Sequence, residues 1–198
     1  MSVSAKMILA LTLITTLSGG VLATWDGFTK PRIEKHRLEE LKAAIADVLP
    51  PYEFYDELQQ EGMTLYIGKT ADNKPVGIAF QAIGSGFQGK ISLMVGVQPG
   101  FSKLTGVKVL EQVETPGLGT KIVEDPSRKA NPFWFSEQFR GIKLDPEIHL
   151  VKNRKPTKPS EIQAITGATI SSTAVVRIVN ETIEKAKTVY QEGHPDSP

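Results

Sequence analysis

A short hydroxyl-rich segment near the C-terminus, T-G-A-T-I-S-S at residues 166–172, has residue types that suit the binding of an anion. Gly167 allows a tight backbone turn, Ala168 keeps the neighbourhood open, and Thr169 presents a hydroxyl just before a predicted helix. The unpaired N–H groups and the dipole of a first helical turn stabilise a phosphate, by about 0.3 to 1 kcal/mol from the dipole alone. A plain helix start has the same pattern, so both interpretations stay open on these residues alone.

A second segment, E-T-P-G-L-G at residues 114–119, is too rich in proline and glycine to form regular structure. Gly117 and Gly119 allow backbone groups to approach a flat ligand closely, Thr115 adds a hydroxyl, and Leu118 offers apolar surface. A simple surface turn is the alternative interpretation.

The hydroxyl-rich segment must be positioned by the element that follows it. Apolar residues recur at helical spacing from Val175 to Ala186, which predicts a helix over about 172–189 with Ser171 or Ser172 as its N-cap.

The region before the second segment alternates between strand and turn patterns. Turn signals at 72–75 and 99–100 separate short apolar runs, so we predict two hairpins in an antiparallel meander. Its four strands cover residues 65–69, 76–82, 91–97 and 104–113. The glycine-rich stretch at 84–89 matches no phosphate-binding fingerprint and is predicted to be a flexible connector. The aromatic residues of 131–139 are predicted to form core or a docking face.

The N-terminal residues predict a membrane anchor. No charged residue lies between Lys6 and Asp26, and this apolar run is just long enough to cross a bilayer. Lys6 before the run favours a cytoplasmic N-terminus, and Trp25 suits the far interface. A cleaved signal peptide ending near Ala23 is the alternative, and either interpretation sends the rest of the chain across the membrane. After a linker at 26–30, an amphipathic helix is expected from Pro31 to the Pro50-Pro51 pair.

Composition excludes several kinds of chemistry. The 198 residues contain no cysteine, so the chain has no disulfide, thiolate metal site or cysteine nucleophile. His36, His149 and His194 are isolated, and we expect no metal site. With 23 basic and 22 acidic residues and no concentrated basic run, nucleic acid is not an expected partner.

The two segments together resemble the motifs of a known family. T-G-A-T at 166–169 is similar to the [S/T]-G-A-T flavin-attachment motif of FMN-binding domains, which occur in the G subunit of the Rnf electron-transport complex and in the C subunit of the sodium-translocating NADH:quinone reductase. E-T-P-G-L-G resembles a second motif of this family, in a loop that lies against the flavin. The resemblance extends to the N-terminal anchor, the strand pairs and the closing helix.

This resemblance implies a cofactor and the residues that hold it. FMN would be bound covalently by a phosphoester to Thr169, and a flavin transferase would attach it during maturation. The implied cofactor-binding residues are Thr169, Thr166, Gly167, Ala168, Glu114, Thr115, Gly117, Leu118 and Gly119, with Glu114 beside the ring system. One residue departs from the family pattern: Gln163 stands where an aspartate usually precedes the motif by three residues, which bears on recognition by the transferase.

We therefore predict an α+β protein with a single N-terminal transmembrane helix and an extracytoplasmic FMN-binding domain built from an antiparallel sheet and packed helices. The expected parts are an anchor at 1–25, a linker and amphipathic helix at 26–60, the FMN-binding domain at 61–190 and a flexible tail at 191–198. The resemblance implies a single-pass subunit of the inner (cytoplasmic) membrane that relays electrons within an Rnf complex, as part of ferredoxin:NAD oxidoreduction coupled to ion translocation. Its partners would be the other membrane and peripheral subunits. The alternatives are the quinone-reductase C subunit and a non-redox extracytoplasmic scaffold domain.

Overall fold

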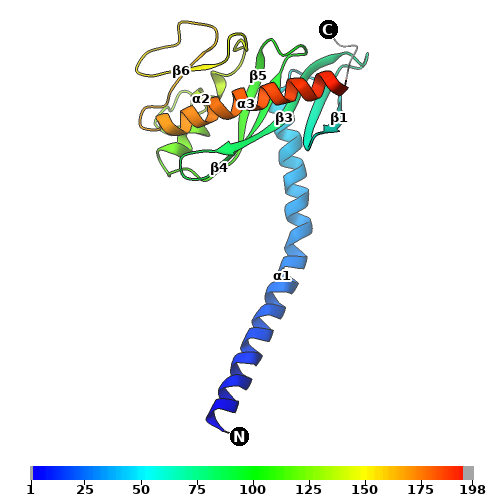
Figure 1. The fold of residues 1–198 in the computed structure, drawn as a ribbon, viewed down its shortest axis with the longest axis vertical. Helices are drawn as coiled ribbons and strands as arrows, with labels where there is room; N and C mark the ends of the chain where they lie inside the picture. Colours follow the sequence, from blue (N-terminus) through cyan, green and yellow to red (C-terminus); the bar gives the residue numbers. More distant parts are fainter. Residues whose placement is uncertain (1, 194–198) are drawn as a thin grey trace. The chain divides into compact units, whose positions relative to one another are not determined.

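The computed structural model describes residues 2–193, which form a long helix and an α+β domain (Figure 1). Helix α1 runs Val3–Val48 without a break. The chain divides into two compact units, one up to Lys42 and one from Ala43 onward. The linker predicted at 26–30 is wrong, because these residues are helical and Pro31 lies inside α1. A proline removes only one N–H group from the helix, so helical structure can continue on both sides of it.

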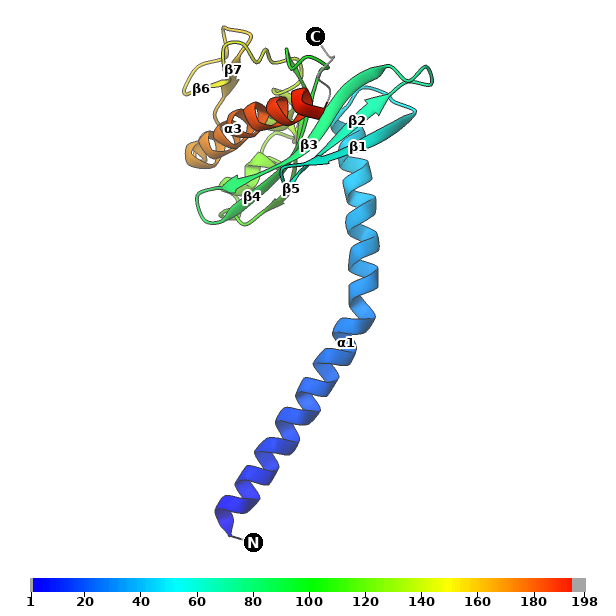
Figure 2. The ribbon, with the colours of Figure 1, turned by 45° about the vertical axis from the view of Figure 1, so that its right-hand side comes forward.

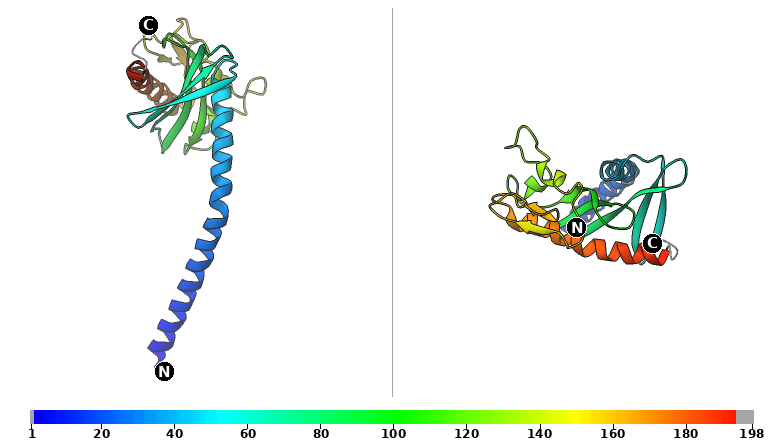
Figure 3. Two further views of the ribbon diagram at one scale, coloured as in Figure 1. Left: turned by 90° about the vertical axis from the view of Figure 1, so that its right-hand side faces the viewer. Right: turned by 90° about the horizontal axis from the view of Figure 1, so that it is seen from above.

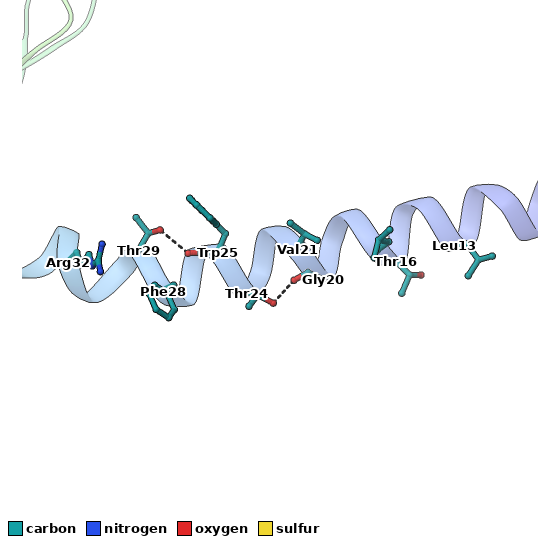
Figure 4. Close-up of a pocket in the computed structure, with 10 residues that line it drawn as sticks. Leu13, Thr16, Gly20, Val21, Thr24, Trp25, Phe28, Thr29 and Arg32 are labelled. Carbon is teal, nitrogen blue, oxygen red and sulfur yellow. Dashed lines mark hydrogen bonds between the residues drawn. The ribbon is translucent and has the colours of Figure 1, made fainter.

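The first unit has the properties of a membrane-spanning helix. By length and composition α1 contains a segment that can cross a bilayer, and none of the side chains in that segment is buried. The residues that line a hollow here, from Leu13 to Arg32, all belong to this one helix, and Figure 4 shows their side chains along it. Within residues 2–193 no second element contributes a wall to this hollow, so it lacks the enclosure of a ligand site.

The second unit contains a five-stranded antiparallel sheet in the order β1-β2-β3-β4-β5 (Figure 2). Its strands are β1 (Phe54–Gln60), β2 (Met63–Lys69), β3 (Pro75–Ser85), β4 (Lys90–Val97) and β5 (Leu104–Gln112). The meander and its four predicted strands are confirmed as β2 to β5. Strand β1 was not predicted, because its polar residues hide the strand pattern. Glu61 and Gly62 join β1 to β2 with positive φ angles of 50° and 74°, the signs that a type I′ hairpin turn requires.

One face of the sheet receives the end of α1 at glycine positions. The Thr105 hydroxyl donates a hydrogen bond to the Val48 carbonyl over 2.5 Å. A Cβ added to either member of the Gly96–Gly106 cross-strand pair would press on the Val48 backbone. At the neighbouring Gly68–Gly77 pair an added Cβ would come within 2.9 and 2.8 Å of Leu49. The absence of side chains therefore lets this short segment lie directly on the sheet.

The opposite face carries the main hydrophobic core. Helix α3 (Thr169–Gly193) packs on this face, as Figures 2 and 3 show, with buried Val175, Val179 and Ile183 among its core residues. The predicted C-terminal helix is thus confirmed, although it continues to Gly193, so residues 191–193 are helical. The rest of the predicted tail, 194–198, lies outside the described residues.

The chain between β5 and α3 forms short elements that complete the core. They are the 3-10 helix η1 (Gly119–Ile122), helix α2 (Trp134–Glu137) and the parallel pair β6 (His149–Val151) and β7 (Glu161–Gln163). The predicted aromatic cluster is confirmed as core for Trp134, Phe135 and Phe139, whereas Phe133 is exposed.

A buried carboxylate fixes the loop that leads into β7. Arg154 donates two hydrogen bonds to Glu161, of 2.8 and 2.7 Å, and the Thr157 N–H donates a third of 2.8 Å. The bonds from Arg154, followed by the one from the Thr157 backbone, hold the pKa of Glu161 well below its usual range. The loop that leads into β7 is therefore anchored just before the T-G-A-T segment.

The glycine contact with Val48 generates a stability prediction. We expect Gly96→Ala to lower the free energy of unfolding by about 1–3 kcal/mol, because the new Cβ overlaps the Val48 carbonyl. Urea unfolding of the full chain in detergent, followed by tryptophan fluorescence, measures the change. Gly27→Ala is the control, since nothing lies within 4 Å of that position. An unchanged midpoint for Gly96→Ala would contradict the close approach.

The Glu161 anchor predicts a pH dependence. Because the folded-state pKa of Glu161 is below its ordinary value of 4.5, its ionised form stabilises the fold above that value, and the contribution is lost as the pH falls below it. We expect Glu161→Gln to lower the urea midpoint at pH 7, with a difference from wild type that narrows under acid conditions. Glu181→Gln, which breaks only an exposed pair with Arg177, should have a smaller effect at every pH. A gap that stays constant with pH would exclude this role.

Candidate functional site

The T-G-A-T segment is the entry to α3. Thr166 and Gly167 are exposed, Ala168 is buried, and Thr169 is half-buried as the first residue of the helix. Gly167 has φ +83°, a left-handed conformation that favours glycine. The segment therefore turns sharply and presents the Thr169 hydroxyl at the helix N-terminus.

The predicted N-cap at Ser171 or Ser172 is wrong, because α3 begins three residues before Ser172. The Ser172 hydroxyl accepts a hydrogen bond from the Ile165 N–H over 3.1 Å and donates to the Ala168 carbonyl over 2.9 Å. Ser172, which lies within the first turn of α3, thus connects this turn to the segment that precedes the helix.

The first turn of α3 retains free donors. Within residues 2–193, the backbone N–H groups of Thr169, Ile170 and Ser171 donate no hydrogen bond. Such groups, together with the helix dipole, are what an anionic ligand meets at a helix N-terminus.

The E-T-P-G-L-G segment forms the tight turn expected from its residues. The Thr115 carbonyl accepts hydrogen bonds from the Leu118 and Thr120 N–H groups, of 3.2 and 3.3 Å, and Gly117 has φ +74°. Leu118 is 48% exposed, whereas Glu114 and Gly119 are buried. The loop therefore presents Leu118 outward and keeps its carboxylate inside.

The fold brings the two segments together. A Cβ added to Gly167 would lie 3.5 Å from Leu118 Cδ2, and one added to Gly119 would lie 2.8 Å from the Ser171 hydroxyl. Ser171 also donates a short hydrogen bond to the Glu114 carboxylate. Segments some fifty residues apart thus share one site at the N-terminus of α3.

The glycine-rich stretch at 84–89 also joins this site, so the prediction that it is a plain connector is wrong. The N–H groups of Phe87 and Gln88 donate hydrogen bonds of 2.9 and 3.1 Å to one oxygen of Glu114. Phe87, Gln88 and Ser171 are therefore site residues that sequence reasoning missed. The signal in the sequence was the pair of glycines at 86 and 89. They flank Phe87 and Gln88, whose backbone N–H groups bond to Glu114.

Hydrogen bonds to the Glu114 carboxyl group lower its pKa. Burial raises the pKa of its carboxyl group, but hydrogen bonds from the Ser171 hydroxyl and the backbone of Gln88 and Phe87 outweigh burial, so the net pKa is below its ordinary value. The site therefore contains a buried carboxylate that accepts hydrogen bonds from the glycine-rich stretch and from the first turn of α3.

Gln163, which departs from the family pattern, has a structural partner. The Gln138 side chain accepts a 2.9 Å hydrogen bond from the Gln163 N–H and donates one of 3.2 Å to its carbonyl. These bonds involve the backbone of Gln163, so they do not depend on its side chain.

Comparison with known proteins gives this site a context. Residues 86–184, which include both motifs and residues 86–89 of the glycine-rich stretch, match the family model of the FMN-binding domain. The G subunit of the Na⁺-translocating ferredoxin:NAD⁺ oxidoreductase complex of Acetobacterium woodii is 30% identical, covering 94% of this chain and 91% of that protein. The G subunit of the ion-translocating oxidoreductase complex of Shewanella baltica is 31% identical, covering 87% and 84%.

Two solved structures share the fold. Shewanella oneidensis NqrC superposes with a TM-score of 0.52 at 22% identity, covering 69% of this chain and 66% of that one. The C subunit of the Na⁺-translocating NADH-quinone reductase of Parabacteroides distasonis has a TM-score of 0.51 at 18% identity, covering 73% and 79%. The expected α+β fold is thereby confirmed. Relatives that match nearly the full length of this chain at about 30% identity are G subunits, and the long apolar helix and both motifs agree with them. The chain therefore belongs to the family of G subunits of ion-translocating oxidoreductase complexes, and residues 86–184 form an FMN-binding domain.

Proposed function

We propose that this chain is the FMN-carrying electron-transfer subunit of an ion-translocating ferredoxin:NAD oxidoreductase complex. The observation that carries the proposal is the meeting of the T-G-A-T and E-T-P-G-L-G segments at the N-terminus of α3, within the part of the chain that matches the FMN-binding family. Bound FMN supplies the redox chemistry, and the chain holds and orients it.

Thr169 is the proposed attachment residue. Its hydroxyl lies at the first residue of α3, beside the three free N–H groups that can stabilise a phosphate. During maturation a flavin transferase would transfer FMN from an activated flavin donor to this oxygen: the donor's bond at phosphorus breaks, its leaving group departs, and the hydroxyl loses its proton. Thr166, Gly167 and Ala168 shape the entry to the helix.

The other motif residues supply the proposed wall of the flavin site. Leu118 offers apolar surface next to Gly167, and Gly117 and Thr115 shape the turn that presents it. Gly119 leaves room for Ser171, and Glu114 belongs to the same site. Phe87 and Ile170, both 59% exposed, add apolar surface on the two neighbouring segments.

The assignment as a G subunit is favoured over the alternatives. Relatives that cover most of the chain at about 30% identity are G subunits, whereas the likeness to C subunits of the quinone reductase, below 25% identity, shows the fold alone. The match to an FMN-binding domain argues against a non-redox scaffold. The remaining subunits of the complex are the proposed partners.

The chain would act as a single-pass membrane protein with the domain on the extracytoplasmic side. The apolar segment of α1 supports the membrane assignment, and Lys6 before it supports a cytoplasmic N-terminus. Lys30, Arg32 and Lys35 follow the segment and favour the opposite orientation by the same rule, which makes the side of the domain a sharp test of this proposal.

The proposed attachment predicts a mass change. Thr169→Ala should abolish the FMN mass increment of the native protein under denaturing conditions, because no hydroxyl remains for the phosphoester. Thr166→Ala, the matched control in the same motif, should at most reduce it. Intact-mass spectrometry after denaturation measures both, and an increment located on a peptide without residue 169 would refute the assignment.

The proposed orientation can be tested because the chain has no cysteine. Asp72→Cys, in an exposed turn of the domain, should react with a membrane-impermeant maleimide in intact cells. Ser4→Cys, before the apolar segment, should react only after permeabilisation. The reverse labelling pattern would place the domain in the cytoplasm, and a mature N-terminus at Thr24 would indicate a cleaved signal peptide instead.

A further inference from the structure

The Glu114 side chain is not free to face a ligand. One carboxylate oxygen accepts the N–H groups of Phe87 and Gln88, and the other accepts the Ser171 hydroxyl. The residue is only 5% exposed. Its contacts therefore connect three segments: the loop at 86–89, its own loop at 114–119, and the first turn of α3.

Each connected segment carries an exposed apolar side chain. Phe87 and Ile170 are 59% exposed and Leu118 is 48% exposed, although large apolar side chains are usually buried in this domain. The position of each of these side chains depends on a backbone segment that Glu114 holds.

The contacts around the carboxylate are tight. A Cβ added to Gly86 would meet a Glu114 carboxylate oxygen, and one added to Gly119 would lie 2.6 Å from Glu114 Cβ and 2.9 Å from its other carboxylate oxygen. Both flanking loops thus approach the side chain as closely as glycine allows, which restricts the carboxylate to one position.

Separate contacts hold α3 on the sheet. The Arg177 guanidinium donates a 2.7 Å hydrogen bond to the Ser85 carbonyl, and Gly84 leaves room for Ile178. Because these contacts do not involve Glu114, loss of one hydrogen bond to its carboxylate should loosen the loops without unfolding the domain.

We propose that Glu114 is a positioning residue of the flavin site, which fixes Leu118, Phe87 and the first turn of α3 relative to one another through hydrogen bonds rather than by touching the flavin. This inference rests on the function proposed above. It specifies how the carboxylate acts: it orders the walls against which the ring lies.

The test uses the full-length flavin-loaded chain in detergent. Ser171→Ala removes one donor to the carboxylate, and Glu114→Gln removes its charge while keeping one acceptor. Glu111→Gln, on an exposed residue of β5 three positions earlier, is the control. We expect Ser171→Ala and Glu114→Gln both to lower flavin fluorescence anisotropy and to shift the visible band and the midpoint potential, while Glu111→Gln leaves all three unchanged.

Different results would overturn the inference in different ways. If both variants lower the unfolding midpoint but keep wild-type flavin signals, the hydrogen bonds of Glu114 stabilise the fold and do not position the flavin site. If Glu114→Gln shifts the midpoint potential but Ser171→Ala does not, the carboxylate acts directly on the ring. A wild-type chain without flavin contradicts the proposed function itself. Should Glu114→Gln not fold, a flavin signal shifted by Ser171→Ala supports the inference and an unshifted one overturns it.

Discussion

The buried carboxylate of Glu114 is the interaction on which the arrangement of the site depends. Removing an ionised carboxylate from water costs several kcal/mol unless hydrogen bonds replace the lost hydration. Here two backbone N–H groups and the Ser171 hydroxyl supply them, and bonds to a charged acceptor are among the strongest in proteins. Because two of these partners lie on the loop at 86–89 and the third on the first turn of α3, movement of either segment would remove hydrogen bonds from the buried charge.

Glycines make these close approaches possible. Gly96 and Gly106 let the end of α1 lie on one sheet face, Gly84 lets α3 lie on the other, and Gly86 and Gly119 admit the Glu114 side chain. At these positions glycine provides room rather than flexibility. Glycines that composition alone would associate with mobile loops therefore mark close contacts in this domain.

The parts of the fold that were predictable from sequence are those with local periodicity. Strands β2 to β5 and the body of α3 show it, whereas the polar residues of β1 obscure it. The start of α3 was misplaced because Ser172 looks like a cap but bonds backward to Ile165 from within the helix. The role of the glycine-rich loop could not be predicted, since its partner Glu114 lies 26 residues beyond Gln88 and no local pattern encodes that pairing. The meeting of the two motifs likewise depends on tertiary packing, and only the family resemblance suggested it.

Under the proposed function, the exposed position of both motifs has a physical rationale. A ligand that binds reversibly needs a pocket that buries most of its surface, whereas Thr166, Gly167 and Leu118 are exposed. A cofactor tethered through its phosphate meets the neighbouring walls at a high effective concentration, so fewer contacts suffice to hold it. An electron carrier also needs its redox group within reach of partner subunits, which a deep pocket would prevent. An open site, however, provides little enclosure to orient a flat ring. Under the proposed function, the buried hydrogen bonds of Glu114 compensate by fixing the segments that form the walls of the site.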